Sequence, residues 1–121
     1  MLDIIVIDDE PHAIKAIELI TKEYCNFIRI VDKANLIEDG WKKIILHKPD
    51  IVILDLNMPR GSGFDLLERF PKRTFEVIIV SAYGDLNDYA KQKYKITEFL
   101  SKPIDIDELL RSLNRIKDIG K

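Results

Sequence analysis

The chain has one cysteine, no long hydrophobic run and no strong excess of charge of either sign. Because Cys25 is alone, no disulfide can form within the chain, which favours a reducing compartment. The formal net charge of -2 argues against the concentrated basic surface that nucleic acid or anionic membrane requires. No apolar stretch approaches the length of a secretory signal or a membrane span. The composition predicts a cytoplasmic protein with no direct binding to nucleic acid or membrane.

The sequence does contain short runs in which successive residues are all apolar, at 4–7, 51–54 and 77–80. A strand tolerates such a run only when both faces of its sheet are covered, so these runs predict central parallel strands. Residues 27–31 and 96–100 carry polar interruptions and predict edge strands. Segments with the periodicity of amphipathic helices separate the strands.

Strand alternating with helix five times predicts a single α/β domain over residues 1–121, doubly wound as (βα)5 and flavodoxin-like. With the mixed strands at the edges, the five-stranded parallel sheet has the order 2-1-3-4-5. In that order the first and third strands are neighbours, and their carboxyl ends open a crevice that can bind ligands.

Residues able to perform chemistry follow the predicted strands. Asp8 and Asp9 follow the first strand, Asp55 the third, Ser81 the fourth and Lys102 the last. Because parallel strands end at one edge of the sheet, we expect these side chains to converge. Three carboxylates in one place repel one another, and Mg²⁺ with its preference for oxygen ligands relieves that repulsion. Asp55 can then act as a nucleophile toward a phosphoryl donor, with a hydroxyl and an ammonium group stabilising the phosphoryl oxygens.

A spaced set of residues resembles the receiver domain of two-component response regulators, and the resemblance covers the whole chain. The set comprises Asp8-Asp9, the motif Asp55-x-x-Met58-Pro59-x-x-x-Gly63, and Lys102-Pro103. Details around residues 8–13 and 102–105 look most similar to receivers of LytTR-type regulators.

This resemblance implies that Asp55 is the phosphoacceptor and that a sensor histidine kinase or phosphotransfer protein is the donor. It implies a non-enzymatic switch that assists its own phosphotransfer and dephosphorylation. The remaining implied features are Mg²⁺ held by Asp8, Asp9, Asp55 and the main-chain carbonyl of Asn57, Lys102 on the phosphoryl oxygens, Ser81 as switch hydroxyl, Phe99 as switch aromatic, and a cis Lys102-Pro103 bond.

The chain departs from the family pattern at two places. Ser81 stands where threonine is commoner, so the hydroxyl is kept without the methyl group that restricts its rotamer. Lys95-Ile96 stands where a small pair such as Gly-Ala is frequent, and a left-handed lysine there would cost about 1 kcal/mol. The helix expected over roughly 86–94 has few apolar anchors, so we expect it to move. Its face, with the last strand and last helix, is the expected partner or homodimer surface.

Other interpretations compete with this one. Taken alone, Asp9 fits a cap of the first helix ahead of Pro11 better than a metal ligand. Each of Ser81 and Lys102 alone fits an ordinary strand end or turn. A flavodoxin-like nucleotide binder is disfavoured because the acidic residues after the first strand would repel a phosphate. An aspartyl-phosphate hydrolase of the haloacid dehalogenase class would need a second Asp where Asn57 stands. A receiver-like module that works without phosphorylation remains an alternative.

Overall fold

A five-stranded parallel sheet forms the centre of the protein. The computed structural model describes residues 1–120. The spatial order is β2-β1-β3-β6-β7, and all four neighbouring pairs are parallel. The strands of this sheet are β1 (Leu2–Ile7), β2 (Ile28–Ala34), β3 (Ile51–Asp55), β6 (Glu76–Ser81) and β7 (Glu98–Ser101). A two-stranded antiparallel pair, β4 (Asn57–Met58) and β5 (Gly61–Ser62), lies in the segment after β3. With that pair set aside, the predicted order 2-1-3-4-5 is confirmed.

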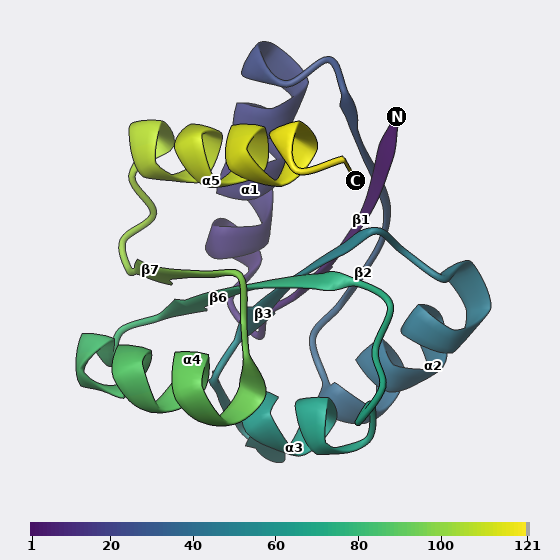
Figure 1. The fold of residues 1–121 in the computed structure, drawn as a ribbon, viewed down its shortest axis with the longest axis vertical. Coiled ribbons are helices and arrows are strands. Elements are labelled where there is room, and N and C mark those ends of the chain that lie inside the picture. The colour runs from purple at the N-terminus through teal and green to yellow at the C-terminus, as the bar shows by residue number, and fades with distance from the viewer. Residues whose placement is uncertain (121) are drawn as a thin grey trace.

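Helices cover both faces of the sheet. They are α1 (Pro11–Tyr24), α2 (Ile37–His47), α3 (Gly63–Glu68), α4 (Asn87–Tyr94) and α5 (Ile106–Asp118), with the 3-10 turn η1 (Gly84–Leu86) directly before α4. Figure 1 shows α1 and α5 on one face and α2, α3 and α4 on the other. Within residues 1–120, no helix has both the length and the apolar character needed to span a membrane.

The sheet separates two hydrophobic cores, and successive residues of a strand contribute to opposite cores. In β1, Ile4 and Val6 pack with α1 and α5, whereas Ile5 and Ile7 pack with α2 and α3. All four side chains are fully buried. Each buried branched side chain stabilises the fold by about 1.5–3 kcal/mol. This two-sided burial explains why the central strands contain no alternating polar residues.

The helix starts correct one interpretation. Asp9 does not cap α1: the capping position is Glu10, which makes no capping hydrogen bond through its side chain, and Pro11 is the first helical residue. The carboxylate of Asp9 is therefore left for the edge of the sheet. At α5, by contrast, Asp105 is a true N-cap, since its Oδ1 accepts from the Glu108 backbone N–H at 3.0 Å.

Candidate functional site: an acidic cluster with one lysine

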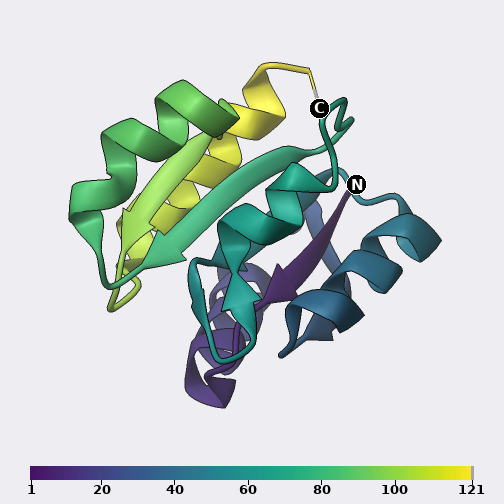
Figure 2. The same cartoon turned by 90° about the horizontal axis from the view of Figure 1, so that it is seen from below.

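The carboxyl ends of the five parallel strands lie along one edge of the sheet, and the arrowheads of β1, β6 and β7 in Figure 2 point the same way. The register places Ile7 opposite Leu54, Asp55 opposite Val80, and Ser81 opposite Ser101. Residues that follow these strands must therefore meet at this edge. Residues 8 and 102, far apart in the sequence, lie close together in space because the parallel strands end at the same level.

Four carboxylates gather at this edge. Asp8, Asp9, Glu10 and Asp55 each offer an oxygen, and these oxygens all lie within 4.8 Å of one another. Asp8 is 2% exposed and Asp55 3% exposed, while Glu10 is open to solvent. An all-oxygen set with two buried carboxylates fits the chemistry of a hard divalent cation such as Mg²⁺. Glu10 was not among the predicted ligands, although its place in the acidic run was visible in the sequence.

Main-chain hydrogen bonds orient the two buried carboxylates. The Glu10 backbone N–H donates to Asp8 Oδ1 at 2.9 Å, and the Asn57 backbone N–H donates to Asp55 Oδ1 at 3.1 Å. Each is a local turn in which an Asp side chain accepts a bond from two residues further along. The turn at Asp55 uses Oδ1 and leaves Oδ2 in contact with Lys102. The direction of the Asn57 carbonyl, predicted as a metal ligand, stays a prediction.

Lys102 reaches into the cluster from the far end of the chain. Its Nζ lies 3.1 Å from Asp8 Oδ2, 2.6 Å from Glu10 Oε1 and 3.1 Å from Asp55 Oδ2. The Lys102 backbone N–H donates to the Ser81 carbonyl at 2.9 Å, and the Lys102-Pro103 bond is cis, as the resemblance implied. One ammonium group thus faces three carboxylates at contact distance.

The electrostatics of the cluster follow from burial and this single cation. Burial, reinforced by the charge of Asp8, raises the pKa of Asp55 even though Asn57 and Lys102 act to lower it. Burial also raises the pKa of Asp9. The hydrogen bond from Lys102 lowers the pKa of Glu10. For Lys102, burial lowers the pKa, but the bonds with Glu10 and Asp8 outweigh burial and leave the pKa raised. A second positive charge would therefore be strongly favoured here.

Ser81 and Phe99 do not join this cluster: Ser81 ends β6, the neighbour of β3, and Phe99 lies in β7, one strand further away. Ser81 is fully buried, and its Oγ accepts from the Tyr83 backbone N–H at 3.0 Å. Within residues 1–120, no hydrogen bond joins Ser81 to Asp55. Phe99 is half-buried in β7 and packs against the core beneath α2, α3 and α4. Of the predicted residues, the structure brings Asp8, Asp9, Asp55 and Lys102 together and leaves Ser81 and Phe99 at the neighbouring strands.

Gly63 has a steric reason to be glycine. A Cβ added at residue 63 would lie 2.8 Å from the Asp55 carbonyl oxygen and 3.0 Å from Leu54 Cγ. The first of these is main chain and cannot move without shifting Asp55. Ser62, directly before it, caps α3 through bonds from the backbone N–H groups of Phe64 and Asp65. The glycine of the motif thus lets α3 start against the end of β3.

Comparison with known proteins agrees with this geometry. The profile of the response regulator receiver domain matches residues 4–114. The chain therefore belongs to the response regulator receiver domain family, as the sequence motifs predicted.

Among curated relatives, the chain is similar to an "uncharacterized response regulatory protein" of Vibrio cholerae serotype O1, with 35% identity over 119 residues that cover 96% of this chain and 48% of the relative. It is also similar to the sensory transduction protein LytT of Bacillus anthracis, with 29% identity covering 97% of this chain and 48% of the relative. The LytT match is consistent with the predicted likeness to LytTR-type receivers. The chain thus spans about half the length of these relatives.

Solved structures show the same fold. The response regulatory domain of mrkE from Klebsiella pneumoniae superposes with a TM-score of 0.87 at 18% identity, over 98% of this chain and 97% of that one. The response regulator domain of CheB from Thermotoga maritima gives a TM-score of 0.85 at 22% identity, over 100% and 99% of the two chains. At these identities the agreement concerns the fold.

Proposed function

We propose that Asp55 accepts a phosphoryl group from a phosphohistidine of a sensor histidine kinase or phosphotransfer protein, in a Mg²⁺-dependent reaction in the cytoplasm. The family membership gives the general role of a phosphoacceptor signalling domain. The observation that carries the finer proposal is the meeting of Asp8, Asp9, Asp55 and Lys102 at one edge of the sheet.

The reaction requires little covalent chemistry from the protein. An Asp55 carboxylate oxygen attacks phosphorus, the bond between phosphorus and the imidazole nitrogen breaks, and the nitrogen keeps the electron pair. Asp8, Asp9 and Asp55 would hold Mg²⁺, which when bound neutralises charge on the carboxylates and the phosphoryl oxygens. Lys102 already contacts Asp55 Oδ2 at 3.1 Å, so its ammonium group needs only a small movement to bind a phosphoryl oxygen.

A groove next to the cluster supports access by a donor protein. It has a volume of about 500 Å³ and is lined by small apolar residues, among them Ala13, Ala16 and Pro103, with Glu10 and Lys102 at the site itself. Small side chains allow close approach of a partner backbone. The imidazole of the donor would then reach Asp55 while the groove contacts the donor's surface around that histidine.

The response to phosphorylation begins at Ser81. The Ser81 hydroxyl accepts a bond from the Tyr83 backbone N–H and keeps its own proton available. The new phosphoryl charge needs hydrogen-bond donors, so Ser81 would donate to it and move the loop that leads into η1 and α4. The chain would thereby act as a switch that assists its own phosphotransfer and dephosphorylation and signals through the surface of α4, β7 and α5.

Incubation with acetyl phosphate and MgCl₂, followed by intact-protein mass spectrometry, tests the proposal. We expect one added phosphoryl group in the wild type, none in Asp55→Asn, and none when EDTA replaces MgCl₂. A wild type that stays unmodified would make the chain a phosphorylation-independent module. Continuous release of phosphate from acetyl phosphate, over many turnovers and without accumulation of modified protein, would instead indicate a hydrolase.

We further propose that the phosphorylated chain associates with a second copy through the surface of α4, β7 and α5. The expected result is a rise in mass by light scattering when acetyl phosphate and MgCl₂ are added, absent in Asp55→Asn. An unchanged monomer mass in a sample shown to be acylated would contradict self-association while leaving phosphoacceptor function intact.

A further inference from the structure

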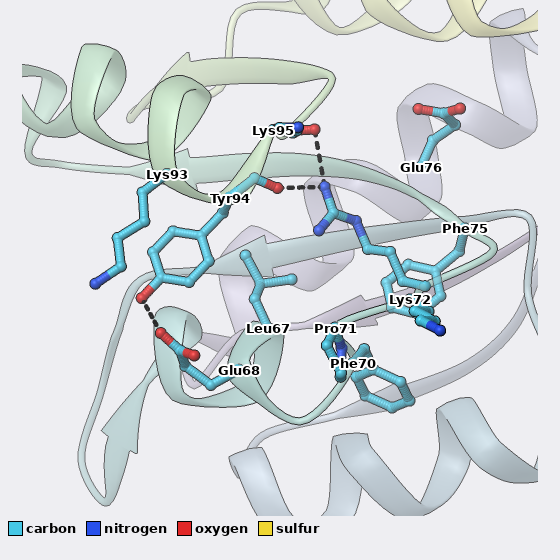
Figure 3. Close-up of a pocket in the computed structure, with 11 residues that line it drawn as sticks. Leu67, Glu68, Phe70, Pro71, Lys72, Phe75, Glu76, Lys93, Tyr94 and Lys95 are labelled. Atoms are coloured by element: carbon cyan, nitrogen blue, oxygen red, sulfur yellow. Dashed lines mark hydrogen bonds between the residues drawn. The ribbon is translucent and has the colours of Figure 1, made fainter.

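The region between α3 and the end of α4 contains a set of contacts that the proposed phosphotransfer does not use. A pocket of about 530 Å³ lies there, lined among others by Phe70, Phe75 and Tyr94. Figure 3 shows that the residues lining it come from the end of α3, the following loop, the start of β6 and the end of α4. Arg73 of that loop is the residue that joins these elements.

Arg73 binds the carboxyl end of α4. Its Nη2 donates to the Tyr94 carbonyl at 2.5 Å and to the Lys95 carbonyl at 2.8 Å, two of the dashed lines in Figure 3. The last carbonyls of a helix have no partner within it and lie at the negative end of the helix dipole. The Arg73 guanidinium group donates hydrogen bonds to two of these carbonyls and places a positive charge at the negative end of the helix dipole. The helix ends there because Lys95 adopts the left-handed conformation, with φ 54°.

Tyr94 adds a second attachment at the same end. Its hydroxyl donates to Glu68 Oε1 of α3 at 2.6 Å (Figure 3). Its ring stacks on Phe64 of α3, with centroids 4.8 Å apart and an interplanar angle of 10°. The carboxyl end of α4 is therefore joined to the loop after α3 by the two hydrogen bonds of Arg73, and to α3 by a hydrogen bond and a ring contact of Tyr94.

The amino end of α4 packs through Leu86 and through Tyr89, which meets Phe64 edge to face, but within residues 1–120 it has no hydrogen-bonded attachment like that of Arg73. No side-chain hydrogen bond caps α4 among the described residues, and its N-cap, Leu86, is itself part of the 3-10 turn η1. Asn87, the first residue of α4, has its Oδ1 buried without a hydrogen-bond partner in residues 1–120. A buried acceptor left unsatisfied is costly, so this end has an incentive to rearrange. It directly follows the loop of residues 81–86 that carries the Ser81 hydroxyl.

We propose that Arg73 is a positioning residue that fixes the carboxyl end of α4 to the loop after α3, so that phosphorylation at Asp55 moves the amino end and α4 pivots about Arg73. This inference rests on the proposed phosphoacceptor function. It assigns to a loop cation far from the acidic cluster the task of giving the movement of α4 a direction. Without Arg73 the carboxyl end would keep only the contacts of Tyr94 with Glu68 and Phe64, and more of the movement would reach that end.

Backbone amide NMR with hydrogen exchange tests the pivot on ¹⁵N-labelled protein, with and without acetyl phosphate and MgCl₂. The variants are Arg73→Ala, Arg73→Lys and the matched control Lys72→Ala, which removes the neighbouring exposed cation of the same loop. Intact mass spectrometry establishes in each sample whether Asp55 is acylated.

In the wild type and in Lys72→Ala, acylation should shift the amide signals of residues 82–90 and leave those of 92–96 nearly unchanged. In Arg73→Ala, the amides of Tyr94 and Lys95 should exchange about tenfold faster before acylation, the effect of losing a charge-assisted hydrogen bond. After acylation, its signals should shift along the whole helix. Arg73→Lys should recover part of the wild-type pattern, because one ammonium group can still bind one carbonyl.

Two results would overturn the pivot: acylated wild type with equal shifts at both ends of α4, or Arg73→Ala behaving like Lys72→Ala. An unacylated wild type is a different failure, because it removes the phosphoacceptor function on which the pivot depends. The mass measurement separates these cases.

Discussion

At the scale of single residues, the acidic edge, meaning the sheet edge with the carboxylates of Asp8, Asp9, Glu10 and Asp55, depends on one lysine for its positive charge. Lys102 is one ammonium group among Asp8, Glu10 and Asp55, and its side chain is 14% exposed. Two of these carboxylates are buried, so their mutual repulsion is weakly screened by solvent. We therefore expect Lys102 to stabilise the folded protein when no metal ion is bound.

Lys102→Met should lower the free energy of unfolding by about 2 kcal/mol in EDTA, because it leaves buried carboxylates without their cation. Urea denaturation at neutral pH measures this, with Lys42→Met on the exposed face of α2 as the control. Adding Asp55→Asn to Lys102→Met should restore part of the loss, since one of the repelling charges is then absent. A double variant no more stable than Lys102→Met would contradict the repulsion argument.

Asp32, in the edge strand β2, shows a different balance of charge. Burial acts to raise its pKa, but hydrogen bonds from the Lys33 backbone N–H and from His47, with the charge of Lys43, leave the pKa lowered. A carboxylate with a lowered folded pKa stabilises the fold above its unfolded pKa, and this contribution is lost as the pH falls through the folded pKa. The stabilisation should thus be present at pH 6 and disappear well below the ordinary value of 3.8.

Asp32→Asn should therefore be less stable than the wild type by about 0.5 kcal/mol at pH 6, and the two proteins should converge near pH 2. Urea titrations at several pH values, with Asp85→Asn in η1 as the control, give the difference curve. A difference that stays constant with pH would mean that Asp32 acts through packing and not through its charge.

At the scale of elements, the end of α4 combines a poor local conformation with a strong tertiary contact. Lys95 has φ 54°, which favours glycine, while its carbonyl accepts from Arg73 at 2.8 Å. Lys95 thus adopts the left-handed conformation whose steric cost the sequence analysis considered for this turn. Because the Arg73 contact is to the main chain, a glycine at 95 would keep it.

Lys95→Gly should raise the free energy of unfolding by about 0.5–1 kcal/mol, because it removes the steric cost of a left-handed side chain. Lys91→Gly, inside α4, should lower it by about 1 kcal/mol. Urea denaturation of the two variants gives opposite signs if the backbone conformation decides. A loss of stability in Lys95→Gly would show that the lysine side chain contributes contacts of its own.

The strands could be predicted from sequence because their signal is local and strong. The run 51–54 is apolar at every position, and the structure buries all of it between two layers of helices. The approach of Lys102 to Asp55 also followed from strand order alone. The contact of Arg73 with α4 could not be predicted, since a long side chain in a loop has many rotamers and its partners are main-chain carbonyls. The pairing of Glu10 with Lys102 was missed for the same reason.

At the scale of the whole molecule, the acidic edge links cation binding to folding. Asp8 and Asp55 come from strands that are neighbours in the sheet, so their carboxylates are close only in the folded chain. A cation that binds the folded state alone stabilises it by mass action. The proposed Mg²⁺ site can therefore be tested without any phosphoryl donor.

MgCl₂ at ten times its dissociation constant should add about 1.4 kcal/mol to the free energy of unfolding and raise the melting temperature by roughly 6 °C. Asp8→Asn should lose most of this response, because it removes a buried carboxylate oxygen from the cluster, whereas Asp85→Asn should keep it. Thermal unfolding followed by circular dichroism measures both, with NaCl at equal ionic strength separating specific binding from screening. An equal rise in Asp8→Asn and the wild type would mean that the cation binds elsewhere on the protein. Mg²⁺ would then not neutralise the charge around Asp55, and that part of the proposal would be wrong.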